Sequence, residues 1–129
     1  MDYAHLISKA IEAREKAYAP YSDFKVGAAL LTRRGKIFTG CNVENASYGL
    51  TICAERTAVV KAISAGEDDF IAIAIVADKE RPCNPCGACR QVLAEFAPDM
   101  EVILANLKGD RVIINLSELL PEAFTFIEK

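Results

Sequence analysis

The segment that most restricts the fold of this chain is an apolar run of eight residues, Phe70-Ile71-Ala72-Ile73-Ala74-Ile75-Val76-Ala77. Its length suits a strand, because a helix that crosses a membrane needs about 20 apolar residues. A strand that is apolar at every position, and not only at alternate positions, is covered on both of its faces. We therefore expect a sheet with helices packed against each side, and no membrane partner.

The remaining secondary structure is predicted from hydrophobic spacing and from turn and cap residues. Further strands are expected at residues 24–32, 37–41, 102–105 and 111–116. Helices are expected from residue 2 to the proline at 20, at 53–65, at 86–96 and at 117–121, with Asp2, Thr51 and Asn84 as N-caps. This order predicts an α/β fold, a three-layer α/β/α sandwich with a mixed five-stranded sheet. The length of 129 residues suits one domain, 1–129, with one core.

The helix expected at 53–65 also bears on assembly. Its many Ala, Val and Ile residues leave only a narrow polar side. A helix that is apolar around most of its circumference is buried on most sides. In a domain of this size, the pattern indicates burial by neighbouring subunits in addition to the chain's own sheet.

Charge and cysteine content restrict the partners. The net charge of -3 argues against a nucleic-acid polymer, whose binding needs a basic groove that displaces counterions from phosphates, and suits a small neutral substrate. The five cysteines are odd in number and clustered, and the N-terminus lacks the basic and apolar segments of a signal peptide. We therefore expect a cytoplasmic protein whose cysteines bind metal instead of forming disulfides.

Three of the cysteines stand at metal-ligand spacing. Cys53 opens one predicted helix, and Cys86 and Cys89 form a Cys-x-x-Cys pair at the start of another. The partial positive charge at a helix N-terminus stabilises the thiolate form that binds metal. Three thiolates leave the fourth corner of a tetrahedral zinc ion open, which is typical of catalytic sites. The motif predicts one Zn²⁺ per chain.

Cys83 leaves an alternative open. Cys83-Asn84-Pro85-Cys86 is a second Cys-x-x-Cys, so four thiolates could close the site around a structural zinc ion. Cys83 lies before the predicted helix, and a closed site would leave Glu55 without a function. We favour the site with three cysteines.

Two residues beside Cys53 fit catalysis at an open zinc ion. Glu55 lies two residues after the ligand in an apolar segment, where a carboxylate can act as general acid/base on a zinc-bound water. Three thiolates exceed the charge of one zinc ion and weaken it as a Lewis acid. Arg56 can donate hydrogen bonds to the ligand sulfurs and offset that excess. The alternatives are a solvated Glu and a surface Arg in a salt bridge.

Longer motifs carry a resemblance to a known family. They are Phe24-Lys25-Val26-Gly27-Ala28-Ala29, Asn42-Val43-Glu44-Asn45-Ala46-Ser47-Tyr48, Cys53-Ala54-Glu55-Arg56-Thr57-Ala58 and Pro85-Cys86-Gly87-Ala88-Cys89-Arg90-Gln91-Val92. The chain resembles the small, homotetrameric, all-cysteine type of cytidine deaminase, in which Cys53 stands where the zinc-deaminase signature has His.

The resemblance implies hydrolytic deamination of cytidine and deoxycytidine to uridine and deoxyuridine with release of ammonia, a reaction of pyrimidine salvage. It implies that zinc hydroxide attacks ring carbon 4. Glu55 would take the proton of the zinc-bound water, deliver it to ring nitrogen 3, and then protonate the departing amine.

The same resemblance implies the substrate contacts. Asn42 and Glu44 are expected to hydrogen-bond the ribose 3′-hydroxyl, and Phe24 to pack against the pyrimidine and sugar. Backbone groups of Ala54 are expected to read the edge of the base.

In a homotetramer, neighbouring subunits are expected to complete each site. The residues at the matching positions are Ala46, Tyr48 and Phe124. Phe126 competes with Phe124 for the position over the base.

Three other functions share part of this pattern. A polynucleotide deaminase would need a basic surface and a histidine ligand, which the chain lacks. A deaminase of a nucleoside-like antibiotic would not need Asn42 and Glu44. A binding module held together by zinc would have a closed four-thiolate site and no turnover.

Overall fold

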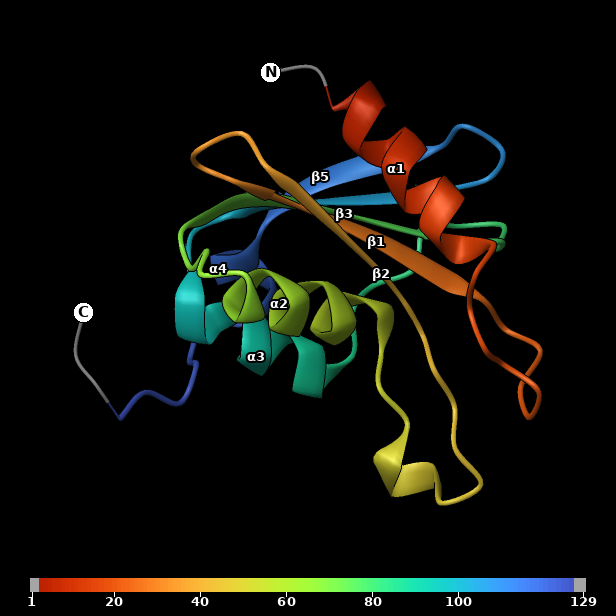
Figure 1. Cartoon of the computed structure of the whole chain (residues 1–129). Helices are drawn as coiled ribbons and strands as arrows, with labels where there is room; N and C mark the ends of the chain where they lie inside the picture. Colours follow the sequence, from red (N-terminus) through yellow and green to blue (C-terminus); the bar gives the residue numbers. More distant parts are fainter. Residues whose placement is uncertain (1–2, 127–129) are drawn as a thin grey trace.

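Five strands form one mixed sheet in the computed structural model, which describes residues 3–126 (Figure 1). The strands are β1 (Val26–Thr32), β2 (Ile37–Cys41), β3 (Phe70–Ala77), β4 (Glu101–Asn106) and β5 (Arg111–Asn115). Their order across the sheet is β2-β1-β3-β4-β5, so β3 lies at the centre. The β3–β4 pair is parallel, and the other neighbouring pairs are antiparallel.

The helices cover both faces of this sheet. Helix α1 (Ala4–Arg14) lies on one face, whereas α2 (Ala54–Ser64), α3 (Gly87–Phe96) and α4 (Leu116–Leu119) lie on the other (Figure 1). A short 3-10 helix, η1 (Tyr48–Leu50), lies in the loop between β2 and α2. The predicted element order and three-layer arrangement are confirmed. Within residues 3–126, no helix has the length and apolarity that crossing a membrane requires.

Strand β3 packs on both sides, as its continuous apolar sequence predicts. Ala72, Ala74 and Val76 belong to the apolar cluster under α1. Ile73 and Ile75 belong to the larger cluster under α2 and α3. Small residues face the single helix and large residues face the helix pair, so the sheet separates two cores.

A glycine in β2 brings the start of α2 directly onto the sheet. A Cβ atom at Gly40 would lie 2.4 Å from the carbonyl oxygen of Ala54 and 2.6 Å from the backbone nitrogen of Ala58. Only glycine allows two backbones to approach so closely. Because Ala54 lies between Cys53 and Glu55, this contact fixes the helix start that carries both residues.

Helix α2 begins close to its predicted position but with a different cap. It starts at Ala54, and Cys53 is its N-cap in an extended conformation. The prediction of Thr51 as the cap is wrong. The Thr51 hydroxyl instead accepts a hydrogen bond from the backbone of Asn45 at 3.2 Å and holds the preceding loop.

Helix α3 differs from the prediction in the same way. It starts at Gly87, and its N-cap is Cys86, not Asn84. The Cys86 sulfur accepts a hydrogen bond from the backbone nitrogen of Cys89 at 3.4 Å, which is the contact that an N-cap side chain makes. Each metal-binding motif therefore places a cysteine at the boundary between loop and helix.

Helix α1 is shorter than its hydrophobic spacing predicts. It ends at Arg14 instead of continuing to the proline at 20. The chain leaves the helix because Tyr18 forms a parallel bridge with Val43 and donates its backbone N–H to the carbonyl of Asn42 at 3.0 Å. The predicted cap Asp2 lies outside the described residues.

Candidate metal centre and active site

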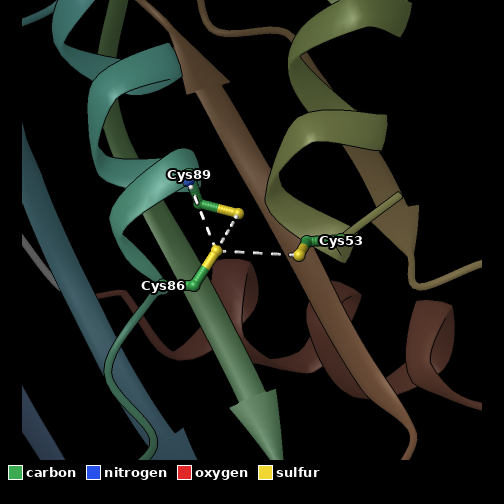
Figure 2. A group of neighbouring side chains, drawn as sticks. All are labelled: Cys53, Cys86 and Cys89. Carbon is green, nitrogen blue, oxygen red and sulfur yellow. Dashed lines mark hydrogen bonds between the residues drawn. The ribbon is translucent and has the colours of Figure 1, made fainter. Parts of the chain in front are cut away.

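Three cysteine sulfurs meet at the starts of α2 and α3. The Sγ atoms of Cys53, Cys86 and Cys89 all lie within 4.8 Å of one another and point toward a common centre (Figure 2). The Cys86–Cys89 sulfur distance is 3.3 Å, and the Cys53–Cys86 distance is 3.8 Å. Both helices direct their positive ends toward this cluster, which favours thiolates.

Hydrogen bonds between the thiols shift the pKa values of Cys53 and Cys89 in opposite directions. The pKa of Cys53 is lowered to about 5, chiefly by a hydrogen bond with Cys89 and also by Arg56. The same hydrogen bond, together with burial, raises the pKa of Cys89. A divalent ion that prefers sulfur would offset two of the three negative charges of the thiolates and leave one in excess. The donor set therefore fits one zinc ion per chain with a fourth corner open.

Arg56 lies beside the cluster. Its Nη2 donates a hydrogen bond to the Cys53 sulfur at 3.4 Å and lies 3.5 Å from the carbonyl oxygen of Thr51. The hydrogen bond to Cys53 raises the pKa of Arg56. The Nε atom of Arg56 is buried without a hydrogen-bond partner among the described residues. The structure thus brings the cation to the sulfur of the thiol whose pKa is lowered.

Next to the cluster lies a cavity of about 230 Å³. Its wall contains all five residues that were predicted to contact or convert the substrate within one chain. They are Phe24, Asn42, Glu44, Ala54 and Glu55. The sulfur-bearing residues Cys53 and Cys86 complete one side of the same cavity. Residues far apart in the sequence therefore converge on one hollow.

Glu55 is the buried acid of this cavity. Its side chain belongs to the first turn of α2, and the residue is only 5% exposed. Burial raises the pKa of Glu55, and the nearby charge of Cys53 adds to this effect. A carboxyl group in such surroundings can hold a proton more readily than an exposed one. This property suits a group that takes up and releases protons.

Asn42 has a structural task that the sequence did not reveal. Its Oδ1 accepts a hydrogen bond from the backbone of Val26 at 2.9 Å, and its Nδ2 donates to the carbonyl of Phe24 at 2.8 Å. One amide hydrogen and one lone pair remain for a ligand. The side chain therefore braces the start of β1 in the cavity wall.

Glu44 is also held in place by the chain. Its carboxylate accepts hydrogen bonds from the backbone of Tyr21 at 2.9 Å and of Ser22 at 3.2 Å, and from the Ser22 hydroxyl. The Ser22 hydroxyl lowers the pKa of Glu44 more than the backbone groups do. The carboxylate is thus fixed in its charged form, and as an acceptor it suits a ligand hydroxyl.

Several wall residues were missed from the sequence. Ser22, Thr51, Cys83 and Asn84 also line the cavity. Lys79 lies over the ring of Phe24, with its Nζ 5.5 Å from the ring centroid. The sequence pattern assigned no role to Ser22, and nothing in it marked Lys79.

Cys83 does not join the sulfur cluster. The group of metal-ligating side chains found within residues 3–126 at this site contains three cysteines only. The Cys83 sulfur lies near the carbonyl oxygen of Asn84 at 3.6 Å, and burial raises the pKa of the Cys83 thiol. The geometry therefore disfavours the closed four-thiolate site.

The three residues expected to serve neighbouring subunits lie outside the cavity of their own chain. Ala46 and Tyr48 belong to the loop that projects from the body of the molecule between β2 and α2 (Figure 1). Tyr48 is 74% exposed, and its ring contacts Tyr21 edge to face at 5.9 Å. Phe124 is 72% exposed near the C-terminal end of the described chain.

Comparison with known proteins identifies the family. Residues 2–105 match the family model described as the cytidine and deoxycytidylate deaminase zinc-binding region. A cytidine deaminase of Halalkalibacterium halodurans is 62% identical over 97% of this chain and 96% of its own length. The chain belongs to the cytidine deaminase family.

Other members of the cytidine deaminase family agree in sequence and in structure. A cytidine deaminase of Sporosarcina psychrophila is 56% identical over 97% of this chain and 93% of its own length. The crystal structure of a cytidine deaminase from Burkholderia pseudomallei superposes with a TM-score of 0.93 at 57% identity, over 96% of this chain and 100% of that one. The predictions of a deaminase fold, an enzyme of this family and a zinc cofactor are confirmed.

Proposed function

We propose that this chain catalyses the hydrolytic deamination of cytidine and deoxycytidine to uridine and deoxyuridine, with release of ammonia, in pyrimidine salvage. The observation that supports this proposal most is the buried Glu55 in the wall of the cavity that the three-cysteine cluster also lines. Membership of the cytidine deaminase family agrees with it.

Cys53, Cys86 and Cys89 would hold the zinc ion. When bound, the ion supplies hydroxide near neutral pH by lowering the pKa of a coordinated water to about 7. Arg56 draws charge from the Cys53 sulfur through its hydrogen bond. We assign to Arg56 the role of maintaining the acidity that three thiolates would otherwise reduce.

Glu55 is the proton carrier in this proposal. Its carboxylate takes a proton from the attacking water and gives it to ring nitrogen 3, while the water oxygen bonds to ring carbon 4. Glu55 then takes the remaining proton from the hydroxyl on carbon 4 and transfers it to the amino group. The carbon–nitrogen bond breaks to release ammonia, and the oxygen on carbon 4 becomes the carbonyl of the product. Burial raises the pKa of Glu55, which helps the carboxyl to hold a proton between the two transfers.

The remaining wall residues would orient the nucleoside. The Glu44 carboxylate suits the ribose 3′-hydroxyl, and so do the amide hydrogen and the oxygen lone pair that Asn42 does not use in its two hydrogen bonds to the backbone. The Phe24 ring in the cavity wall would pack against the pyrimidine and sugar, and the backbone of Ala54, in the same wall, would hydrogen-bond the edge of the base. Because Asn42 and Glu44 are held by backbone groups, binding would need little reordering of either side chain.

The active species in this proposal is a homo-oligomer, with a homotetramer as the family expectation. Val60 and Ile63 of α2 are 52% and 38% exposed in the single chain, although Val59 and Ala62, the residues before them, are buried. The loop residues Tyr48 and Leu50 are also exposed. Burying these apolar surfaces against other copies would bring Ala46, Tyr48 and Phe124 to adjacent sites.

The cellular setting and domain organisation complete the proposal. Cys41, Cys53, Cys83, Cys86 and Cys89 are all free thiols, which suits a reducing cytoplasm. We assign residues 1–129 to one catalytic domain, because one sheet with two covered faces accommodates the site and its walls.

The test is the loss of cytidine absorbance with purified protein, before and after chelation of its metal. We expect turnover with cytidine and deoxycytidine, loss of turnover with the metal, and recovery when zinc is restored. A cytosine-containing single-stranded oligonucleotide and an aminonucleoside antibiotic serve as competing substrates. Turnover of either one without turnover of cytidine would refute the proposal, and so would no turnover with any of them.

A further inference from the structure

Gln91 in α3 holds the backbone of Phe124 at both of its polar groups. The Nε2 of Gln91 donates to the Phe124 carbonyl oxygen at 2.8 Å, and its Oε1 accepts from the Phe124 nitrogen at 3.2 Å. The amide of Gln91 thus pairs with both the N–H and the C=O of one residue, as the backbone of a neighbouring strand does in an antiparallel sheet. We call these two hydrogen bonds between Gln91 and Phe124 the clamp. Gln91 lies two residues after Cys89, so the clamp extends from the helix at whose start two of the predicted zinc ligands lie.

The residue before Gln91 fastens the same segment further back. Arg90 donates to the carbonyl of Leu119 at 2.9 Å and to the carbonyl of Pro85 at 2.8 Å. Two consecutive side chains of α3 therefore attach the C-terminal segment at Leu119 and again at Phe124. The Pro85 contact ties the same network to the turn that precedes Cys86.

The clamp fixes the backbone of Phe124 but leaves its ring outside. The ring is 72% exposed, and it is not among the described residues that line the cavity of its own chain. Ala123, one residue earlier, still packs against the core under α2 and α3. An exposed aromatic ring contributes little to the stability of its own chain. We therefore look for the contact partner of the Phe124 ring in a second copy of the chain.

Phe126 differs from Phe124 in this respect. It is 92% exposed and lies two residues beyond the clamp, which corresponds to at most about 7 Å of extended chain. A ring whose backbone is already held loses less conformational entropy on contacting a ligand than a ring whose backbone must first be ordered. The geometry favours Phe124 as the aromatic that a neighbouring site would use.

We propose that Gln91 is a positioning residue, which presents Phe124 to the substrate cavity of a neighbouring copy. This inference rests on the proposed function and on its oligomeric form. Gln91 itself touches no substrate and acts through the place it gives to the Phe124 ring. The ring then packs against the bound pyrimidine nucleoside.

Four variants test this role. Gln91→Met keeps the length and helix propensity of the side chain but removes both hydrogen bonds, and Phe124→Ala removes the ring. The double variant Gln91→Met with Phe124→Ala tests whether both changes act through one contact, and Phe126→Ala is the matched control. Zinc content and sedimentation are measured for every variant.

We expect the KM for cytidine to rise about tenfold in Gln91→Met and in Phe124→Ala, because a loss of about 1.4 kcal/mol corresponds to that factor. The value of kcat should change by less than about twofold, since an orienting contact acts mainly on binding. The double variant should resemble Phe124→Ala, because the clamp has no further effect once the ring is gone. Phe126→Ala should resemble the wild type.

A second measurement does not depend on activity. Hydrogen exchange at the Phe124 amide should be slow in the wild type and faster in Gln91→Met; equal rates would overturn the clamp. An unchanged KM in Gln91→Met, or loss of its zinc or oligomeric state, would overturn the positioning role. If the wild type itself fails to deaminate cytidine, the proposed function fails, and with it the role of Phe124.

Discussion

The Nη2 atom of Arg56 lies 3.4 Å from the sulfur of Cys53, within hydrogen-bond distance of a predicted zinc ligand. Arg56 and Cys53 are separated by one turn of the same helix start, so the cation and the thiolate belong to one rigid unit. The helix start that positions the Cys53 ligand therefore also positions the cation that offsets its charge. A change at Arg56 should therefore affect the chemistry of the site more than the stability of the fold.

Replacing Arg56 tests this relationship. Arg56→Gln keeps a hydrogen-bond donor but removes the charge, and we expect turnover to fall about 10- to 100-fold, the usual range for residues that support metal ligands. Cytidine turnover and zinc content are measured together. Arg34→Gln, at an exposed arginine of the β1–β2 turn, is the matched control. Equal turnover in the two variants would show that the contact with Cys53 has no catalytic effect.

Glu55→Gln preserves the size of the side chain and removes its ability to carry a proton. We expect kcat to fall by about a thousandfold, within the range for a lost general acid/base. Burial raises the pKa of Glu55, so the charged form is disfavoured in the folded state, and the urea midpoint of the variant should be no lower than that of the wild type. Zinc content should remain at one ion per chain. Near-normal turnover would exclude Glu55 as the proton carrier.

Cys83→Ser distinguishes the three-cysteine site from the four-cysteine alternative. Because the Cys83 sulfur lies outside the cluster of Cys53, Cys86 and Cys89, we expect one zinc ion per chain and turnover within about twofold of the wild type. Cys86→Ser is the matched variant and should lose its metal. Loss of zinc in Cys83→Ser, measured by atomic absorption, would reopen the closed site.

The alkaline limit of stability should depend on Tyr3. Its hydroxyl donates a hydrogen bond to Glu101 at 2.5 Å, and burial, followed by this hydrogen bond, raises the pKa of Tyr3 to about 12. A raised pKa means that the protonated phenol stabilises the fold. That contribution is complete below pH 10 and is lost as the pH rises toward 12.

Tyr3→Phe removes the hydroxyl and should abolish this dependence. We expect the variant to be less stable than the wild type at pH 8 by about 1 kcal/mol and the difference to shrink steadily above pH 10. Urea unfolding at a series of pH values measures it. Tyr18→Phe, at an exposed tyrosine, is the control. A difference that stays constant up to pH 12 would show that Tyr3 does not titrate with folding.

Features that depend on local pattern were predictable from the sequence. The apolar run Phe70–Ala77 predicted a central strand with two covered faces, and both the bounds and the burial of β3 agree. The spacing of Cys53, Cys86 and Cys89 predicted the cluster, because helix starts present side chains at short sequence intervals. Strand β3 and the Cys86–Cys89 pair each involve neighbouring residues, whereas Cys53 joins that pair from 33 positions away.

Features that depend on contacts between distant segments were not predictable. Thr51 does not cap α2, because its hydroxyl accepts a hydrogen bond from the Asn45 backbone and the next residue, Ile52, bridges Val43. The bracing of β1 by Asn42 and the position of Lys79 over Phe24 arise only when loops from different parts of the chain pack together. The spacing of apolar residues along the sequence gives no information about such contacts.

The contact between Gly40 and Ala54 limits how this scaffold can be altered by mutation. Any side chain at position 40 would have to push aside the backbone from which both Cys53 and Glu55 extend. A single methyl group there would therefore disturb metal ligand and acid together, although neither residue is itself changed. Attempts to broaden substrate range are better directed at Asn84, which lines the cavity from the loop before α3 and lies far in the sequence from this contact.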